Sequence, residues 1–388
     1  MLESLVRGAL KQRLVVCVIA VVLLFFGLHA ATKLSVDAFP DVTNVQVQIA
    51  TEAAGRSPEE VERFATVPIE VAMTGLPGLT ELRSLNKPGL SLITLVFTDS
   101  TNVYFARQLV MERLMEVGQR LPPGITPVLG PVSSGLGEVY QYTLEHPADG
   151  KRELSEEELT QRRVVQDWVL RPLLRSIPGV AEINSQGGFV KQYHVLVNPE
   201  RLRHYKISLS EVYDAVSRNN ANSGGGVLPQ AAEQYLIRGV GLIQGVGDLG
   251  QIVLKEINGT PVYMRDVAEV KLGHDVRQGA LIKNGTTEAV GGIVMMMTGG
   301  NAKEVVSRIK KRVKEINDRG MLPHDLKVVP YYDRSELVDA ALWTVTKVLI
   351  EGVVLVVIVL FLFLGDVRSS LIVVATLVLT PLLTFMAM

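Results

Sequence analysis

Cysteine is almost absent from this 388-residue chain, in which Cys17 is the only one. A single thiol excludes an intrachain disulfide framework and a cysteine-rich zinc site, and redox chemistry is not expected. An excess of either charge is also lacking, because 39 Lys and Arg residues offset 40 Asp and Glu residues. Recognition of nucleic acid needs a basic surface, so we expect no nucleic-acid partner.

Aromatic residues are scarce as well, at 6%, whereas 47% of the residues are hydrophobic. The mean hydropathy of +0.26 is high for a soluble protein and excludes a disordered chain. Much of the apolar excess lies in three runs near the two ends, at 14–31, 341–364 and 371–388. An 18-residue helix is about 27 Å long, close to the thickness of a bilayer core. We therefore predict three membrane spans, the third of them a truncated helix.

A cleaved secretory signal is the alternative interpretation of the first apolar run. Basic residues precede the run, and Ala30 and Ala31 would suit a cleavage site. The run is long for a signal, however, and further apolar runs follow. We therefore expect a span.

Basic residues predict the orientation of these spans. Arg7, Lys11 and Arg13 precede the first run, and Arg368 lies between the second and third. Positive charge favours the cytoplasmic side, so we place the N-terminus and the second connection there. The intervening segment, 34–340, would then lie outside the cytoplasm, and its length of about three hundred residues predicts at least two domains.

The extracytoplasmic segment contains four helix starts with one signature, a short polar residue followed three residues later by Glu. The pairs are Ser57 and Glu60, Ser155 and Glu158, Ser208 and Glu211, and Asn301 and Glu304. Alternating apolar residues predict strands at 45–51, 91–98, 137–144 and 192–197. The order suggests a β-α-β-β-α-β, or ferredoxin-like, unit at about 40–132 and a less complete second one from 135. A Gly-rich stretch at 223–275 predicts a β-rich insertion. The expected fold class is membrane α-helical plus α+β.

Several long motifs then carry a family resemblance. They are SVDAFPDVTNVQVQI at 35–49, AGRSPEEVE at 54–62, GLPGLTELRS at 75–84, GPVSSGLGEVYQYTL at 130–144 and VPYYDRSELVDAA at 329–341. With one span before a duplicated region and two close spans after it, the chain resembles the N-terminal half of resistance-nodulation-division (RND) efflux pumps. The motifs are most similar to those of the heavy-metal efflux branch, the CzcA type.

The resemblance implies a division of the chain. It assigns 1–33 to the cytoplasmic N-terminus and first span, 34–134 to a first porter subdomain, 135–181 with 275–328 to a second, and 182–274 to a docking subdomain. Residues 329–340 would return as the final strand, 341–364 would form the second span, and 371–388 would begin the third.

The resemblance also implies the function. Such a pump is a cation/proton antiporter and not an enzyme. It forms a homotrimer in the bacterial inner membrane, with a large periplasmic domain, a periplasmic adaptor protein and an outer-membrane channel. Its cargo would be a divalent zinc, cobalt, cadmium or nickel ion, with no permanently bound cofactor. The proton-relay acids of the fourth span and half of the porter cleft would lie outside this chain.

Two other functions stay open. An RND exporter of drugs or other amphiphiles would favour an aromatic-lined pocket, which the low aromatic content disfavours. A membrane-anchored periplasmic adaptor or binding module would transport nothing. Continuation of the reading frame with acidic residues in a later span would separate a pump from an adaptor.

Glu138 and Asp167 are the candidate metal-binding residues. Divalent transition ions favour carboxylate and imidazole ligands, and an exporter needs a site that releases its ion. Glu138 starts a predicted strand at a position where the resemblance implies an acid in divalent-cation pumps, although it could be an exposed strand end. Asp167 is a second candidate by the family pattern. Arg163 and Arg171, each four residues away on the same helix, offer it ordinary ion pairs instead.

The remaining candidates have structural interpretations. None of the six histidines falls at metal-ligand spacing from another. Met295 and Met297 would share one face of a strand, and core packing is favoured over soft-metal binding. Lys347 and Glu351 are one helical turn apart in the second span and can neutralise each other there, and His29 has an interfacial interpretation.

Overall fold

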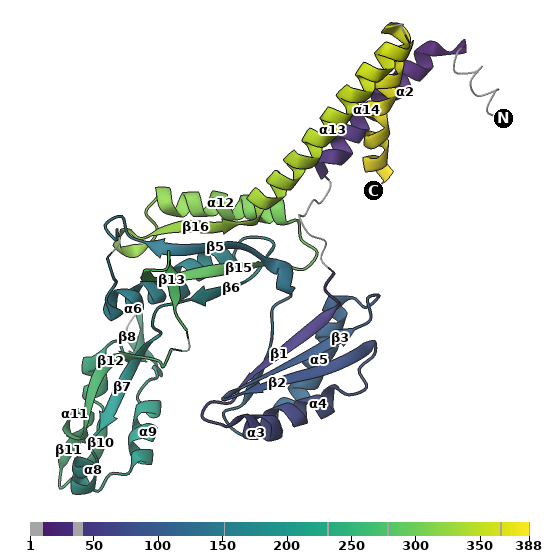
Figure 1. Cartoon of the computed structure of the whole chain (residues 1–388). Helices are drawn as coiled ribbons and strands as arrows, with labels where there is room; N and C mark the ends of the chain where they lie inside the picture. The colour runs from purple at the N-terminus through teal and green to yellow at the C-terminus, as the bar shows by residue number, and fades with distance from the viewer. Residues whose placement is uncertain are drawn as a thin grey trace.

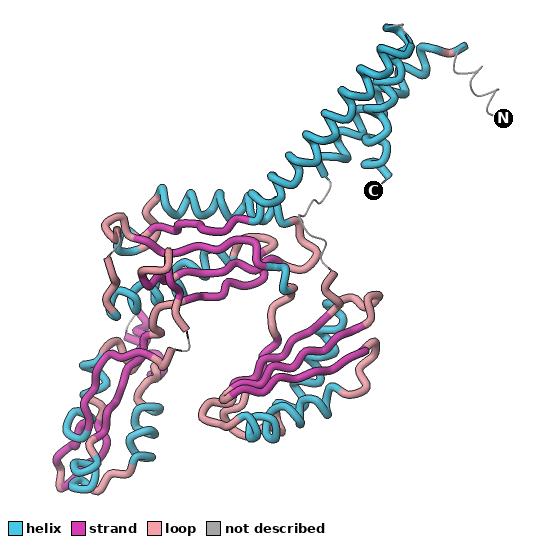
Figure 2. Tube along the Cα trace, in the orientation of Figure 1, coloured by secondary structure: helices cyan, strands magenta, loops and turns pink. Residues whose placement is uncertain are grey.

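The computed structural model describes residues 11–33, 42–150, 152–230, 233–277, 279–364 and 367–387. Three long helices extend from one end of the molecule, and two sheet-containing units lie below them (Figure 1). A third body projects from the second unit, at the end far from the long helices. Figure 2 shows the same division, with strands in all three bodies and none among the long helices.

The first sheet unit has the element order β-α-β-β-α-β. It comprises β1 (Gln46–Glu52), α3 (Pro58–Val61), η1 (Glu62–Thr66), α4 (Val67–Met73), β2 (Leu79–Lys87), β3 (Leu90–Phe97), α5 (Val103–Gly118) and β4 (Thr126–Leu129). The strands form one sheet in the order β2-β3-β1-β4. Its core contains inward-facing residues of the strands, such as Ile49 and Leu95, and of the helices, such as Ile69 and Val110.

The second sheet unit repeats this order with an interruption. It comprises β5 (Glu138–Glu145), α6 (Glu156–Val165), η3 (Gln166–Leu170), α7 (Arg171–Arg175) and β6 (Val180–Gln186), and later β15 (Gly291–Met296), α12 (Ala302–Asp318) and β16 (Lys327–Asp333). The sheet order, β16-β5-β15-β6, matches that of the first unit element for element. Short 3₁₀ turns, η2 (Gly135–Gly137) and η4 (Pro323–Asp325), precede β5 and β16.

The interruption forms a separate body, which we call the distal body (residues 191–274). It contains β7 (Lys191–Val197), α8 (Pro199–Tyr205), α9 (Leu209–Arg218), β8 (Ser223–Gln230), β9 (Glu233–Gly239), α10 (Val246–Gly250), β10 (Val253–Ile257), β11 (Thr260–Tyr263), α11 (Met264–Val267) and β12 (Ala268–His274). Its own core includes Leu202, Val212 and Met264. A small hairpin, β13 (Leu281–Lys283) and β14 (Thr287–Ala289), leads back to β15. The stretch expected to be β-rich, 223–275, contains β8 to β12 with two short helices, α10 and α11, whereas α8 and α9 precede it.

Helix caps explain where the predicted helices begin. The side chains of Ser57, Ser155 and Ser208 each accept a hydrogen bond from the backbone N–H three residues on, and the Glu at that position bonds back. These reciprocal bonds satisfy donors that the first helical turn leaves unpaired. Asn301 accepts the forward bond from Glu304.

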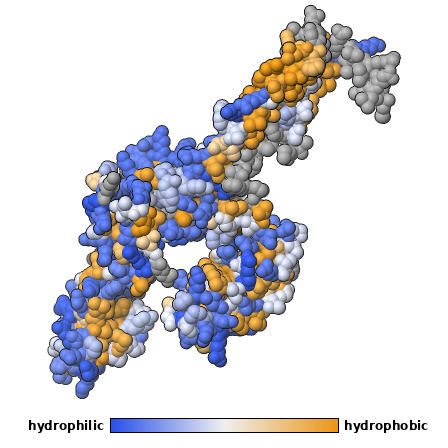
Figure 3. All heavy atoms as spheres, viewed as in Figure 1, coloured by the Kyte–Doolittle hydropathy of each residue, from blue (hydrophilic) through white to orange (hydrophobic). Residues whose placement is uncertain are grey.

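Three apolar helices form the remaining part: α2 (Arg13–Lys33), α13 (Arg334–Leu364) and α14 (Val367–Ala387). In the described residues, one helix, 334–363, is long and apolar enough to cross a membrane, and 14–30 and 372–384 form shorter apolar helices. Hydrophobic residues cover much of this region (Figure 3). Gly27 of α2 lies against Leu382 of α14, where a Cβ would come within 2.7 Å of the leucine Cβ. The basic residue Arg7 lies outside the described residues.

Two expected boundaries differ in the structure. The final strand ends at Asp333 instead of 340, because the Asp333 carboxylate accepts hydrogen bonds from the Ser335 N–H (2.8 Å) and hydroxyl (2.7 Å) and so starts α13 seven residues early. The expected boundary at 182 falls inside β6, since Glu182 pairs with Met295 in the second sheet. The projecting body therefore starts later, at Lys191.

Candidate functional site

Glu138 is the first residue of β5 and follows the η2 turn directly. It is half-buried, and its cross-strand neighbour is Met295 of β15. The Gln141 side-chain amide donates a 3.0 Å hydrogen bond to Glu138 Oε2. No ion pair with Glu138 occurs among the described residues. The side chain that orients the Glu138 carboxylate is therefore a neutral donor.

Two tyrosines at this end of the second sheet have raised pKa values. Burial raises the pKa of Tyr331, and the negative charge of Glu138 raises it further. Burial likewise raises the pKa of Tyr140 to about 12, with a smaller contribution from Asp333. Both phenols are therefore neutral hydrogen-bonding groups at ordinary pH beside an acidic carboxylate.

Asp167 lies in a different environment, inside a closed polar network. Its Oδ2 accepts a 2.7 Å hydrogen bond from Arg163 Nε, and its Oδ1 accepts one from the Ser185 hydroxyl of β6. Arg163 also donates to the Gly187 carbonyl at 2.8 Å. Both carboxylate oxygens are engaged, one by a guanidinium, so the positive charge of Arg163 opposes the binding of a cation by Asp167 in this arrangement.

The predicted Arg171–Asp167 pair is wrong. Arg171 Nη2 instead lies 2.7 Å from Glu182 Oε1 of β6. The reason is the π-helical turn η3 (Gln166–Leu170), which contains Asp167, ends directly before Arg171 and breaks the i,i+4 spacing of a regular α-helix. Arg163 precedes the turn and keeps its pairing with Asp167.

Each sheet unit contains such a π-turn, and each turn holds a buried polar side chain against the sheet. In the second unit, Gln166 exchanges hydrogen bonds with the Tyr142 hydroxyl at 3.0–3.1 Å. In the first, Thr66 of η1 bonds to Asn86 at 2.6 Å and lies 2.7 Å from the Ser91 hydroxyl. A proline follows two residues after each turn, Pro68 and Pro172, and proline cannot donate to the helical ladder. These prolines were the sequence signal for the irregular turns.

Glu138 and Asp167 do not form one site in the structure. Glu138 pairs through Met295 with Glu182, whereas the Asp167 partner Ser185 pairs with Gly292. Glu182 and Ser185 are three residues, or about 10 Å, apart along β6, and β15 lies between Glu138 and that strand. No cluster of three or more His, Cys, Asp or Glu residues suited to a metal ion occurs in the described part of the chain.

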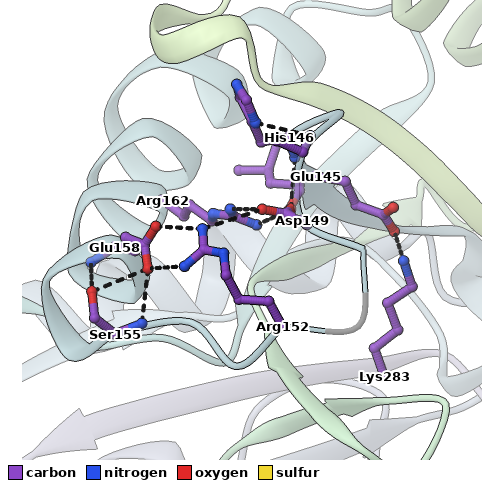
Figure 4. A network of polar contacts seen from close by, with 10 residues as sticks. Glu145, His146, Asp149, Arg152, Ser155, Glu158, Arg162 and Lys283 are labelled. Carbon is purple, nitrogen blue, oxygen red and sulfur yellow. Dashed lines mark hydrogen bonds and ion pairs between the residues drawn. The ribbon is translucent and has the colours of Figure 1, made fainter.

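A second polar network, which sequence reasoning missed, joins α6 to the end of β5 (Figure 4). The buried Arg162 guanidinium binds both oxygens of Asp149 at 2.6 and 2.8 Å and donates to the Leu144 carbonyl at 3.1 Å. Beside it, Arg152 binds both oxygens of Glu158 at 2.6 and 2.9 Å. A charged residue at a core-facing helical position, Arg162, was the signal in the sequence.

The pKa values of the two acids follow from these partners. Burial alone would raise the pKa of Asp149, but hydrogen bonds from Arg162 and the His146 N–H outweigh burial and lower it. The hydrogen bond from Arg152, followed by that from the Ser155 N–H, lowers the pKa of Glu158 to about 2. Both acids stay ionised and paired, so this network serves to fix α6 against the sheet.

The methionines of β15 and the Lys347–Glu351 pair of α13 have structural roles. Met296 belongs to the second core and Met295 is buried beside Glu138, while β15 ends before Met297. Lys347 Nζ and Glu351 Oε1 are 3.8 Å apart on α13, the expected one-turn spacing.

The chain matches known proteins over its whole length. The model of the AcrB/AcrD/AcrF family matches residues 5–388. Protein HelA of Legionella pneumophila is 45% identical, and the cobalt-zinc-cadmium resistance protein CzcA of Cupriavidus metallidurans is 44% identical, each over 100% of this chain. The chain spans 36% of the length of these relatives.

The fold comparison agrees with the sequence comparison. An X-ray crystal structure of a heavy metal efflux pump superposes with a TM-score of 0.89 and 37% sequence identity, covering 99% of this chain and 38% of that one. The duplicated sheet units, the inserted distal body and the apolar helices therefore occur in the same arrangement in a solved pump. The chain belongs to the AcrB/AcrD/AcrF family of RND transporters.

Proposed function

We propose that this chain is the N-terminal part of a proton-driven efflux pump that exports divalent heavy-metal ions: zinc, cobalt, cadmium or nickel. The observation that carries the proposal is the likeness of 99% of this chain to 38% of a solved heavy metal efflux pump at 37% identity. The name of CzcA, a cobalt-zinc-cadmium resistance protein at 44% identity, supports the class of cargo. The family and the apolar helices support a multi-pass protein of the bacterial inner membrane.

The division of labour within the chain is part of this proposal. The two sheet units are the porter subdomains, and the distal body is the docking subdomain, because it lies at the end far from the membrane helices (Figure 1). There it can meet a periplasmic adaptor and an outer-membrane channel. The proton relay and the second half of the porter cleft belong to the remainder of the pump.

Glu138 is the proposed ligand for the exported ion. Its support is a carboxylate that has no cationic side chain paired with it in the described residues and that is oriented by Gln141 at 3.0 Å. Carboxylate oxygen suits borderline divalent ions, and a site with few ligands releases its ion readily. Asp167 is already paired with the Arg163 guanidinium and bonded by Ser185, so it is the weaker of the two proposed ligands.

The β8–β9 hairpin supports a homotrimer. Its apolar side chains are exposed: Val227, Leu228, Tyr235, Leu236 and Ile237. A projecting apolar hairpin is typical of a surface that another chain covers. We propose that the hairpin packs against a neighbouring copy.

Leu236→Asp should therefore shift the purified pump from trimer to monomer in native mass spectrometry. Leu209→Asp, at an exposed leucine of α9 in the same body, should not.

The experiment that tests the function uses a host lacking related pumps. The full-length pump containing this chain should raise the zinc or cobalt concentration that cells tolerate. Residues 1–388 alone should leave them as sensitive as empty-vector cells, because they lack the proposed proton relay. Resistance from residues 1–388 alone, or no metal resistance from the full-length pump, would contradict the proposal.

A further inference from the structure

A histidine and a glutamate meet where the distal body joins the second sheet unit. His274 is the last residue of β12, in the distal body, and Glu156 is the first residue of α6, in the second unit. His274 Nε2 lies 3.8 Å from Glu156 Oε2. The two side chains line a cavity of about 460 Å³ between α6, the β7–β12 ribbon and the η4 turn. This contact therefore connects two separately packed bodies.

The imidazole ring of His274 is already oriented for a ligand at Nε2. Its Nδ1 lies 2.9 Å from the backbone carbonyl oxygen of Asp275. A neutral ring that donates from Nδ1 to this carbonyl has its lone pair on Nε2, the nitrogen that faces Glu156. Metal-binding histidines commonly donate their second ring N–H to a backbone carbonyl in this way.

Packing holds the same ring in place. The centroid of the His274 ring lies 4.4 Å from that of Phe189, which is buried in a small cluster with Leu159 of α6 and Val290. The Arg277 guanidinium lies 4.6 Å from the Phe189 ring centre. Contact with the Phe189 ring therefore restricts the orientation of the His274 imidazole.

We propose that His274 and Glu156 bind a hydrated divalent transition-metal ion that bridges the distal body and the second sheet unit. Zinc–nitrogen and zinc–oxygen bonds of about 2.0–2.2 Å in tetrahedral geometry place the two donor atoms about 3.4 Å apart. The observed 3.8 Å thus needs only a slight closure. No third His, Cys, Asp or Glu completes a cluster in the described residues, so water fills the other positions and the ion is held weakly. This site does not depend on Glu138.

Charged groups around the site determine how strongly it attracts a cation. Glu157 of α6 favours a cation, while Lys191, directly opposite His274 on β7, disfavours one. Asp275 and Arg277 follow β12, and His324 lies on the η4 wall of the cavity. Removing the Lys191 charge should strengthen binding.

The test is a titration of the purified chain in detergent with Co²⁺, followed by calorimetry and by visible absorption. His274→Gln and Glu156→Gln should each weaken binding about tenfold or more. Lys191→Met should tighten it about threefold. His194→Gln is the matched control. His194 lies on β7 of the same ribbon, but it pairs with Lys271, three residues from His274, and contacts Gln192 instead of Glu156.

A second readout tests the bridge itself. Saturating Co²⁺ should slow hydrogen exchange in β7 and β12 of the wild-type chain but not of His274→Gln, because the ion ties the ribbon to α6. An isotherm that His274→Gln and Glu156→Gln leave unchanged overturns the proposal, as does the absence of Co²⁺ binding below about 1 mM. The His274-dependent slowing of exchange is read in β7 and β12, to which Glu138 of β5 does not belong, so failure of the Glu138 proposal is distinguishable from failure here.

Discussion

The Lys310 ammonium of α12 lies 2.6 Å from a carboxylate oxygen of Asp333, the residue at which β16 ends and α13 begins. A second pair follows along α13, where Lys303 Nζ is 2.7 Å from Asp339 Oδ1. The helix that packs on the second sheet is thus tied twice to the start of the long apolar helix.

Breaking the first pair should loosen this junction. Burial alone would raise the pKa of Asp333, but hydrogen bonds from Lys310 and Ser335 lower it below its ordinary value. Lys310→Met leaves a nearly buried carboxylate without its cation and should cost about 1–3 kcal/mol of local stability. Faster hydrogen exchange in β16 and in the first turns of α13 is the measurement. Lys311→Met, at an exposed neighbour on α12, should have no such effect.

The same pair gives a pH dependence with a defined sign. Because the folded-state pKa of Asp333 lies below the unfolded value, its stabilisation is complete above the unfolded pKa, about 3.9, and is lost as the pH falls through the folded pKa. Acid should therefore accelerate exchange at this junction in the wild-type chain. Asp333→Asn should be less stable at neutral pH and less sensitive to acid, and equal acid sensitivity would contradict the assignment.

The sequence predicted the parts of this fold that depend on local chemistry. Ser57, Ser155 and Ser208 start helices because a hydroxyl and a Glu three residues on satisfy the same few donors, whatever surrounds them. The end of β16 at Asp333 was missed because residues 329–340 were assigned to a strand by resemblance. Asp333 and Glu336 nevertheless have the same three-residue spacing as the other helix starts, and the Asp333 carboxylate caps Ser335. The partner of Arg171 was missed because the π-turn rotates it away from Asp167 towards Glu182.

A buried hydroxyl in the first unit should be replaceable with a gain in stability. Thr51 Oγ1 is the one buried side-chain N or O atom without a hydrogen-bond partner in the described residues. Valine has the same shape and no unsatisfied group, so Thr51→Val should stabilise the unit by up to about 1 kcal/mol. Slower hydrogen exchange in β1 and β3 is the expected observation.

Thr66 provides the opposite case within the same core. Its hydroxyl bonds to Asn86 and Ser91, so Thr66→Val leaves two polar groups without their partner and should destabilise the unit by about 1–3 kcal/mol. If Thr51→Val and Thr66→Val changed the hydrogen-exchange rates in the same direction, the assignment of a hydrogen-bonded hydroxyl to Thr66 and an unpaired one to Thr51 would be contradicted.

Reporter fusions test the proposed membrane orientation. Gly150, in the second sheet unit, and Gly259, in the distal body, should report a periplasmic location. A fusion at Gly365, which lies outside the described residues, should report a cytoplasmic one, since Arg368 favours that side of the second connection. Alkaline phosphatase activity at Gly150 and Gly259, and its absence at Gly365, is the expected pattern. A cytoplasmic signal at Gly150 would overturn the orientation of the whole chain.

The last prediction separates the two proposed metal ligands in the full-length pump. Glu138→Gln keeps the size of the side chain and its contact with Gln141 but removes the charge that attracts a divalent ion. Zinc or cobalt resistance should fall while the protein level and trimer assembly stay unchanged. Gln141→Leu should have a smaller effect, because it removes only the group that orients the carboxylate.

Asp167→Asn should impair transport less than Glu138→Gln, because Arg163 and Ser185 already occupy both oxygens of Asp167. The double variant decides whether the acids act on one ion. Residues that share a ligand fail to add, whereas separate positions about 10 Å apart along the strands should give additive losses. The geometry predicts additivity. A double variant no worse than Glu138→Gln alone would mean that the two carboxylates converge during transport, and unchanged metal resistance in Glu138→Gln would mean that other residues bind the ion.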